Sequence, residues 1–375
     1  MAQEKEESRK KNFSSAKSKK RKRPVKILLT HISDDIILCI LSSLPTESIC
    51  RFKCVCKSWQ RLLSSQEFTQ FHSLSLKLPS DTFALASNGQ GFIFLQNSKN
   101  FTQNYSNLAP PLTLPVSGHL NHFVCSNGIV SYTIIKNPNI YVCNPVTKQH
   151  LTFPFHHFCH PTILGFYFNP VSHTFKLLVR RLFFHRRGER FTMFVSATEF
   201  SMLSSATGHW KQIAASQDIM CWKQPAICVD GICYQVFNEC PNMVSAFDME
   251  KENWEHIPLP VMDEYEVSFT KLVEQEGRVC LVRSAEKNKF EIWRLIKEIK
   301  KWEKVLGPFM VREFGFKTAH QWSIIPHRRS LFFARVSFCG IEQLYLYKNG
   351  HLRRKFNWVR HGIFPFTPTL NYLAS

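Results

Sequence analysis

The sequence has no apolar stretch long enough to cross a membrane. The run from Ile36 to Leu41 has six residues, whereas a membrane-spanning helix needs about 20. The N-terminus is charged throughout and has no apolar core, so it does not have the form of a secretory signal. We therefore expect neither membrane insertion nor secretion.

Acidic side chains are scarce, and signatures of catalysis are missing. The chain has 28 Asp and Glu against 48 Lys and Arg, and its carboxylates form no pairing distinct from surface charge. It has no phosphate-binding glycine loop, no nucleophile elbow and no His-Glu-x-x-His motif. We expect a protein without catalytic residues or cofactors.

Metal ligands are also poorly placed. The run from Phe155 to His160 gathers three histidines and one cysteine, which are zinc ligands. Neighbours this close cannot all turn toward one ion, and no second matching pair stands out. We expect a His-rich loop and no metal site.

Thirteen cysteines are present, yet nothing indicates a disulfide framework. Without a secretory signal, they are expected to be reduced thiols. Several lie in β-like runs and are expected to pack as small hydrophobic side chains. These are Cys125, Cys143, Cys228 and Cys233.

Positive charge is concentrated at the N-terminus. Residues 1–26 hold eleven Lys or Arg and three Glu, a net +8 of the total +20, which leaves +12 for the rest. Such a block cannot bury apolar surface and is expected to be disordered. It matches a nuclear localisation signal, with a merely solvated tail as the alternative, so we expect the nucleus and/or the cytoplasm. The signal residues would be Lys17, Lys19, Lys20, Arg21, Lys22 and Arg23.

The segment from His31 to Phe68 has helical periodicity. Ser33 can cap a helix whose first turn carries two aspartates, where the helix dipole favours negative charge. Pro45 ends this helix, Thr46 can cap a second one, and a third apolar stretch runs from Val55 to Leu63. Three short helices cannot enclose much core, so some apolar side chains should stay exposed for a partner. The first helix carries its stripe at Ile36, Ile37, Ile40, Leu41 and Leu44.

This segment resembles an F-box, the module by which substrate receptors bind the Skp-type adaptor of cullin ubiquitin ligases. The stretch from Ser43 to Trp59, SLPTESICRFKCVCKSW, is similar to plant F-boxes almost residue for residue. Ile32 and Ser33 stand where the family commonly has Leu-Pro, and Cys39 where it often has Glu. The resemblance implies an adaptor, and through it a cullin and a RING subunit, as partners; a helical cap without a partner is the alternative. The implied adaptor-binding residues are Ile32, Ile36, Ile37, Leu41, Pro45, Val55 and Trp59.

From about residue 74 onward, short β-rich runs alternate with turn residues, a pattern typical of an all-β domain. A longer period is also present, because Trp210, Trp254 and Trp302 are 44 and 48 residues apart and His351 follows 49 later. Such a period predicts β-propeller blades of four strands, about six in all. We expect the tryptophans to pack between blades rather than to bind a ligand.

Ordered phrases in this region resemble the F-box-associated domain of plant F-box proteins, a kelch-like β-propeller. They are CSNGIV (125–130), CNPVTKQHLTFP (143–154), GFYFNPVSHTFKLL (165–178), VDGICY (229–234) and AFDMEKENWEHIPLP (246–260). The implied chain is mainly β with a small α-helical module: a basic tail at 1–26, a three-helix F-box at 27–72 and an irregular propeller at 73–375. The implied role is that of a non-catalytic substrate receptor of a ubiquitin ligase.

The place where a target would bind is predicted from unusual loops, since loops carry recognition on rigid scaffolds. They are Phe155–Thr162, Phe183–Arg190 and Gln235–Asn242. The run from Arg180 to Arg190 has five arginines, and Arg186, Arg187 and Arg190 would suit an acidic or phosphorylated target. A solvated hairpin tip is the alternative, with the same alternative for the basic run from Arg353 to Lys355. A further alternative for the whole chain is a basic propeller that binds nucleic acid or protein without a ligase role.

Overall fold

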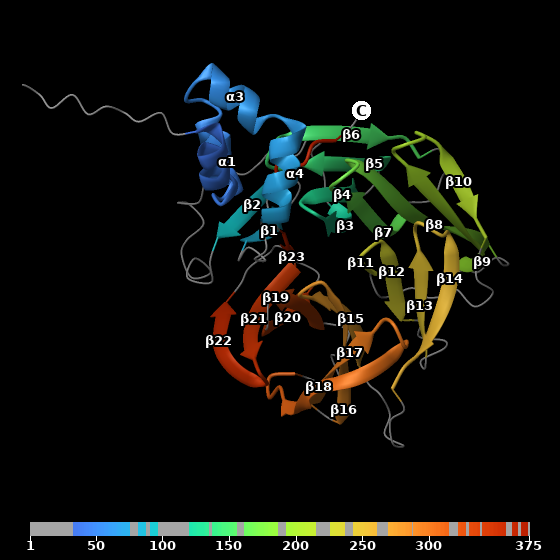
Figure 1. Ribbon diagram of the computed structural model, residues 1–375. Coiled ribbons are helices and arrows are strands. Elements are labelled where there is room, and N and C mark those ends of the chain that lie inside the picture. The colour runs from blue at the N-terminus through green and yellow to red at the C-terminus, as the bar shows by residue number, and fades with distance from the viewer. Residues whose placement is uncertain are drawn as a thin grey trace, which may run out of the picture. The chain divides into compact units, whose positions relative to one another are not determined.

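The computed structural model divides the chain into two compact units, Met1–Leu41 and Ser42–Ser375. It describes a segment of four helices, followed by β-strands (Figure 1). The described residues are 33–75, 82–87, 91–96, 120–134, 137–155, 161–186, 193–214, 226–236, 243–260, 269–286, 288–314, 322–327, 330–337, 340–357, 362–366 and 369–373.

Four helices, rather than the expected three, make up the N-terminal segment. They are α1 (Asp34–Ser42), α2 (Thr46–Phe52), α3 (Lys57–Leu63) and α4 (Gln66–Ser75). The first begins as predicted, with the Ile37 amide donating to the Ser33 carbonyl at 3.1 Å. Thr46 is not a cap, because Pro45 occupies the N-cap position of α2 and Thr46 is already helical.

The fourth helix starts at a serine whose signal was available in the sequence. Ser65 Oγ accepts the Phe68 amide at 3.2 Å, and the Ser65 carbonyl accepts the Thr69 amide. A serine that caps the first turn is a common helix start. The apolar stretch predicted from Val55 to Leu63 is not a single helix. Val55 lies in a turn, and α3 begins at Lys57.

The strands of unit Ser42–Ser375 form a ring of antiparallel sheets (Figure 1). The first four-stranded blade has β3 (Leu120–Ser126), β4 (Ile129–Ile134), β5 (Asn137–Asn144) and β6 (Gln149–Phe153). The second has β7 (Thr162–Asn169), β8 (Thr174–Arg186), β9 (Met193–Ser204) and β10 (Trp210–Ile213). The third has β11 (Ile227–Val229), β12 (Ile232–Val236), β13 (Met243–Asp248) and β14 (Asn253–Pro258).

Two more blades complete the four-stranded set. The fourth has β15 (Thr270–Gln275), β16 (Arg278–Glu286), β17 (Lys289–Ile296) and β18 (Lys301–Met310). The fifth has β19 (Trp322–His327), β20 (Ser330–Ser337), β21 (Gly340–Lys348) and β22 (His351–Asn357). In each blade the strands are neighbours in chain order, as the 44–49-residue period predicted.

The expectation of about six such blades is corrected to five, because the sixth sheet has three described strands. It consists of β1 (Thr82–Ser87), β2 (Gly91–Gln96) and β23 (Gly362–Pro365), in the order β2-β1-β23. The two ends of the propeller sequence share this sheet, since β23 pairs antiparallel with β1. Residues 97–119, where a fourth strand would follow β2, lie outside the described part.

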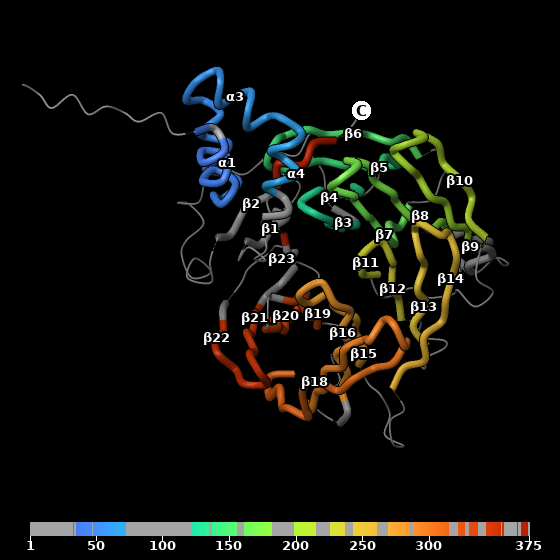
Figure 2. The backbone as a smooth tube through the Cα atoms, in the orientation of Figure 1, coloured from blue at the N-terminus to red at the C-terminus, as the bar shows by residue number. Residues whose placement is uncertain are grey.

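The last residues extend beyond β23 to the first blade. Figure 2 shows this red C-terminal segment along the green β5–β6 strands. The amide of buried Asn144 donates to the carbonyls of Thr369 and Asn371, at 3.1 and 2.6 Å. Asn371 in turn donates to the Asn127 carbonyl at 3.0 Å, and Leu373 is buried in the core between the first two blades. These contacts hold residues 369–373 against the first blade, in addition to the pairing of β23 with β1.

The core of the propeller lies between adjacent blades. One cluster joins the fourth and fifth blades around Phe290, which is fully buried and packs against Phe314 and Phe333 at 4.9 and 5.1 Å between ring centroids. Blades two and three approach closely at Gly165, where an added Cβ would lie 2.0 Å from Cys233 Sγ. Only glycine fits this position without a shift of the neighbouring strand.

The turns between paired strands have the residues that tight turns need. Gly128, Gly231 and Gly277 have φ of 75°, 76° and 73°, and each follows a residue that also has positive φ, as type I′ hairpin turns require. Asn144 Oδ1 accepts the Val146 amide at 2.8 Å, and Asp248 Oδ1 accepts the Glu250 amide at 2.9 Å. Both side chains therefore form Asx turns.

Candidate functional site

Helix α1 exposes a pair of isoleucines one turn apart. Ile36 is 53% exposed and Ile40 54% exposed, while Ile37 is half-buried and Leu41 is buried. Residues four apart lie on the same face of a helix. This face therefore offers an apolar strip to solvent.

Another exposed apolar side chain, that of Val55, lies in the turn between α2 and α3. Val55 is 61% exposed, the most exposed large hydrophobic side chain among the helices. Trp59, one turn further on, is half-buried and packs edge-on against Phe52 at 5.6 Å between centroids. Cys54 and Cys56, on either side of Val55, are also exposed.

The helices of unit Ser42–Ser375 have a small complete core of their own. Ile49, Leu63 and Phe68 are fully buried. His72 is buried as well; its Nε2 lies 3.0 Å from the Leu44 carbonyl, and its ring stacks on Phe68 at 5.9 Å. Burial lowers the pKa of His72 below its ordinary value, so it packs as a neutral ring. The exposure of Val55 is therefore not a consequence of an unformed core.

The predicted adaptor-binding residues thus fall into different environments. Ile36, Pro45 and Val55 are exposed, Ile37 and Trp59 are half-buried, and Leu41 is buried. Ile32 lies outside the described residues. Their role in binding the adaptor stays a prediction.

The propeller has two unlike faces, set by its strand order. At one, which we call the short-turn face, tight turns join the first strand of each blade to the second and the third to the fourth. At the other, the long-loop face, the remaining connections run, including those from Ile213 to Ile227 and from Met310 to Trp322. The inner strands β3, β7, β11, β15 and β19 all begin at the long-loop face.

This order brings together the three predicted target-binding loops. The strand ends that flank them, such as Phe153 with Thr162 and Val236 with Met243, all lie at the long-loop face. Their limits need correction, because Phe183–Arg186 belongs to β8 and Gln235 to β12. The paired hairpin β8–β9 is longer than the sequence pattern suggested, with a bulge between Phe183 and Phe184. Arg187 and Arg190, like most of each loop, lie outside the described residues.

The repeated tryptophans pack between blades, as predicted. Trp254 Nε1 donates to the Ala214 carbonyl of the preceding blade at 3.1 Å, and Trp302 Nε1 donates to the Pro258 carbonyl at 2.9 Å. The Trp210 ring packs edge-on against Phe155, which follows β6 of the first blade, at 5.2 Å between centroids. The sequence reasoning missed the repeated hydrogen bond, which only the three-dimensional register reveals.

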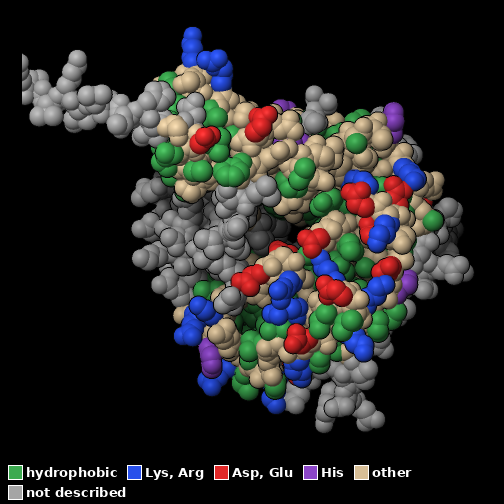
Figure 3. Space-filling model, in the orientation of Figure 1, with side chains coloured by type: hydrophobic (Ala, Val, Ile, Leu, Met, Phe, Trp, Pro, Cys, Tyr) green, Lys and Arg blue, Asp and Glu red, His purple; other side chains and the backbone are tan. Residues whose placement is uncertain are grey.

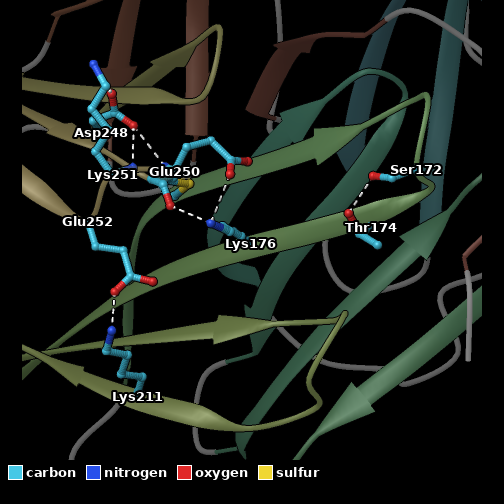
Figure 4. A network of polar contacts seen from close by, with 9 residues as sticks. Ser172, Thr174, Lys176, Lys211, Asp248, Glu250, Lys251 and Glu252 are labelled. Atoms are coloured by element: carbon cyan, nitrogen blue, oxygen red, sulfur yellow. Dashed lines mark hydrogen bonds and ion pairs between the residues drawn. The ribbon is translucent and has the colours of Figure 1, made fainter.

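Charges on the short-turn face are paired from blade to blade. Figure 4 shows Lys176 of β8 reaching Glu250 of the β13–β14 turn at 3.3 Å, and Lys211 of β10 paired with Glu252 of the same turn. Lys297 reaches Asp230 of the preceding blade at 2.5 Å. The view in Figure 3 likewise shows acidic and basic side chains interspersed over the blades. Glu250, Glu252 and Asp230 are thus each paired with a lysine of a neighbouring blade.

The described residues contain no cluster of three or more His, Cys, Asp or Glu that could hold a metal ion. Most of the His-rich run lies outside them, as do the tail lysines and arginines. Cys143 and Cys233 are buried, while Cys125 and Cys228 are half-buried. Arg353 is exposed on β22, and Lys355 Nζ lies 5.4 Å from the centre of the Tyr345 ring. Within the described part, no helix is long and apolar enough to cross a membrane.

Comparison with known proteins gives matches in both parts of the chain. Residues 29–71 match the F-box domain family, and residues 80–354 match the family of the F-box associated beta propeller domain. F-box protein At5g49610 of Arabidopsis thaliana is 24% identical over 370 residues, which cover 86% of this chain and 95% of the relative. F-box protein At3g49450 of the same plant is 22% identical over 272 residues, covering 66% of this chain and 64% of the relative.

Proposed function

The chain belongs to the plant F-box proteins that carry an F-box associated β-propeller domain, and on that premise we propose that it is a substrate receptor of a cullin-based ubiquitin ligase. Its F-box would bind a Skp-type adaptor, and its propeller would bind the target protein. The adaptor would connect it to a cullin and a RING subunit.

The observation that carries this proposal is the exposure of apolar side chains in the helical part of each unit. Isoleucine and valine side chains that stay more than half exposed on a folded helical module are costly unless a partner covers them. Ile36 and Val55 are of this kind, and both belong to the set that the F-box resemblance implies for the adaptor.

The proposed mechanism is proximity. A receptor that holds a target near a ubiquitin-loaded conjugating enzyme raises the effective concentration of the reacting groups without contributing a catalytic group. The propeller suits this role, because each blade packs on its neighbours and the ring is fastened by the chain end. A rigid body of this kind keeps the distance from target to enzyme short and constant.

Co-expression with a Skp-type adaptor tests the proposal. We expect the full chain to co-purify with the adaptor, and we expect the chain without residues 31–70 to lose it. Substitution of Ile299, which is 57% exposed on the propeller, by Asp is the matched control and should leave the complex intact. Failure of the full chain to co-purify, or retention by the deleted chain, would contradict the proposal.

We also propose import into the nucleus through the basic residues from Lys17 to Arg23, since such a block matches a nuclear signal. A fluorescent fusion should move from the nucleus to the cytoplasm when Lys19, Lys20 and Arg21 are changed to Ser. An unchanged distribution would leave the block as a solvated tail.

A further inference from the structure

The β11–β12 hairpin of the third blade brings two cysteines together. Cys228 and Cys233 are directly opposite one another in the strand register, and their Sγ atoms lie 2.8 Å apart as free thiols. Side chains of directly opposite residues lie on the same face of a sheet. Both thiols belong to the core between the second and third blades.

The turn of this hairpin sets the spacing of the two strands at the cysteines. Asp230 and Gly231 have φ of 49° and 76°, as a two-residue type I′ turn requires. The residues that flank such a turn form a hydrogen-bonded pair, so Cys228 and Cys233, one step further out, form a non-hydrogen-bonded pair with Cα atoms about 4.5 Å apart. A disulfide joins Cα atoms about 4.4–6.8 Å apart. The strand register therefore permits a bond between the two sulfurs.

The equivalent position in other blades lacks a second thiol. In the β3–β4 hairpin Cys125 faces Val130, and in the β15–β16 hairpin Glu274 faces Val279. Cys125 is half-buried, as Cys228 is. It is thus a thiol in the same place of another hairpin, with a valine instead of a cysteine opposite.

The two thiols of the third blade differ in access to solvent. Cys228 is half-buried, whereas Cys233 is 4% exposed. The Cys233 sulfur lies against Gly165 of the second blade, where an added Cβ would be 2.0 Å from it. Burial raises the pKa of the Cys233 thiol well above its ordinary value. A small oxidant would therefore react first at Cys228, and Cys233 would follow from inside the core.

A bond at this place would act on a short strand. β11 has three residues, fewer than any other strand in the described part of the chain. Its turn residue Asp230 is paired with Lys297 of the fourth blade at 2.5 Å, and Cys233 contacts Gly165 of the second. The hairpin thus connects three blades, and its first strand is held to the second by only three residue pairs.

We propose that Cys228 and Cys233 form a reversible disulfide when the chain meets hydrogen peroxide, and that this bond stabilises the pairing of β11 with β12. The Cys228 sulfur attacks one oxygen of the peroxide; the O–O bond breaks, and a sulfenic acid and one water form. The Cys233 sulfur then attacks the Cys228 sulfur, and the S–O bond breaks. The hydroxyl leaves with the Cys233 proton as a second water.

The reaction is balanced by the peroxide alone. The two thiols together lose two electrons and two protons, and the peroxide takes them up to give two molecules of water. A small-molecule thiol reverses the bond by thiol–disulfide exchange, starting from the half-buried Cys228. The inference goes beyond the proposed function and does not depend on it.

Peptide mapping of the full chain tests the inference. The reduced chain is treated with a small excess of hydrogen peroxide, its remaining thiols are blocked with N-ethylmaleimide, and it is cleaved before Asp230, which separates the two cysteines. We expect two peptides joined through Cys228 and Cys233, with two hydrogen atoms fewer than the reduced pair. Dithiothreitol should separate them. The oxidised chain should unfold at a temperature about 2–4 °C higher than the reduced chain, because the bond restrains the unfolded state.

Three variants complete the test. Cys228→Ser and Cys233→Ala should each abolish both the joined peptides and the rise in unfolding temperature, and agreement between them guards against a folding defect in one. Cys125→Ser, the matched control, should leave both results as in the wild type. The inference is overturned if both thiols remain open to N-ethylmaleimide after peroxide, or if the peptides are joined through another cysteine. A wild-type unfolding temperature that peroxide leaves unchanged, or a rise that persists in Cys228→Ser, would overturn the effect on β11.

Discussion

The helical segment and the propeller treat their apolar side chains differently. Four of the nine large exposed hydrophobic side chains in the described residues lie between Ile36 and Phe71, whereas the far longer propeller holds the other five. The propeller puts its apolar residues between blades and closes on itself through β1 and β23. Among the described residues, apolar side chains of the propeller are thus mostly packed between blades, whereas exposed ones are more frequent in the short helical segment.

The same difference separates two kinds of recognition. A helical module with a fixed apolar surface suits one constant partner, because burial of apolar area is strong but carries little specificity. Under the proposed function, the propeller would instead meet its target on a frame of packed blades whose described surface carries charged side chains.

The largest expected effect comes from the propeller core. Phe290→Ala should destabilise the chain by about 3–5 kcal/mol, since it removes a fully buried ring that contacts four other aromatic rings. Chemical denaturation measures the loss. If the propeller is complete by itself, saturating adaptor should not restore its stability. Recovery of the variant's stability with adaptor would contradict the difference drawn between the two regions.

A smaller loss of stability is expected when the C-terminal segment loses its hydrogen bonds to Asn144. Asn144→Ala removes two bonds to the C-terminal segment and two turn bonds, and should cost about 2–3 kcal/mol. Asn169→Ala is the matched control, because Asn169 accepts the corresponding turn amides of Val171 and Ser172. The difference in unfolding free energy between the two variants measures the contribution of the hydrogen bonds from Asn144 to the C-terminal segment. Equal losses would show that the C-terminal segment contributes nothing through Asn144.

The repeated tryptophan bond should contribute about 1 kcal/mol at each blade boundary. Trp254→Phe and Trp302→Phe keep an aromatic ring but lose the bonds to Ala214 and Pro258. We expect similar decreases in stability for the two variants, and additivity in the double variant, because different blade boundaries are involved. Thermal denaturation checks this, and a negligible change in either variant would contradict the repeated role.

The last effect is a dependence of stability on pH. The folded-state pKa of Lys271 is lowered by burial from 10.5 to about 8. Below about pH 8 both the folded and the unfolded chain hold the Lys271 proton, and folding must bury the charge. Between about pH 8 and 10.5 the unfolded chain keeps a proton that the folded chain has lost. Stability should therefore rise with pH from about 8 to 10.5, by at most about 1.4 kcal/mol per pH unit. Denaturation of the wild type against Lys271→Met across the window measures this, and parallel curves would contradict it.

Local signals in the sequence were enough for much of the fold. The spacing of Trp210, Trp254 and Trp302 predicted the blades, since each blade is built from strands that are consecutive in the chain. The helix after Ser65 was missed, although its capping serine was visible. The blade number was overestimated because the sixth sheet combines strands from both ends of the domain, a pairing that no local period encodes.

The site was less accessible from the sequence. The predicted adaptor residues could be named from the F-box resemblance, but their division into exposed Val55 and buried Leu41 required packing. The run of arginines between Arg180 and Arg190 marked the predicted basic loop in the sequence. Lys271 is an isolated lysine that belongs to no motif. Its contact with Ser323 arises because the first strands of two neighbouring blades, β15 and β19, lie side by side although the two residues are 52 apart in the chain.

The most direct test of the central claim is a calorimetric titration of the purified chain with a Skp-type adaptor. Two variants each place a charge at an exposed apolar position of the helical segment, Ile36→Asp and Val55→Asp, and Ile299→Asp places the same charge at an exposed apolar position of the propeller. The account predicts that each of the first two weakens adaptor binding by about 30-fold or more, as for interface side chains of about 2 kcal/mol, and that Ile299→Asp binds like the wild type. Wild-type affinity in both helical variants would contradict it.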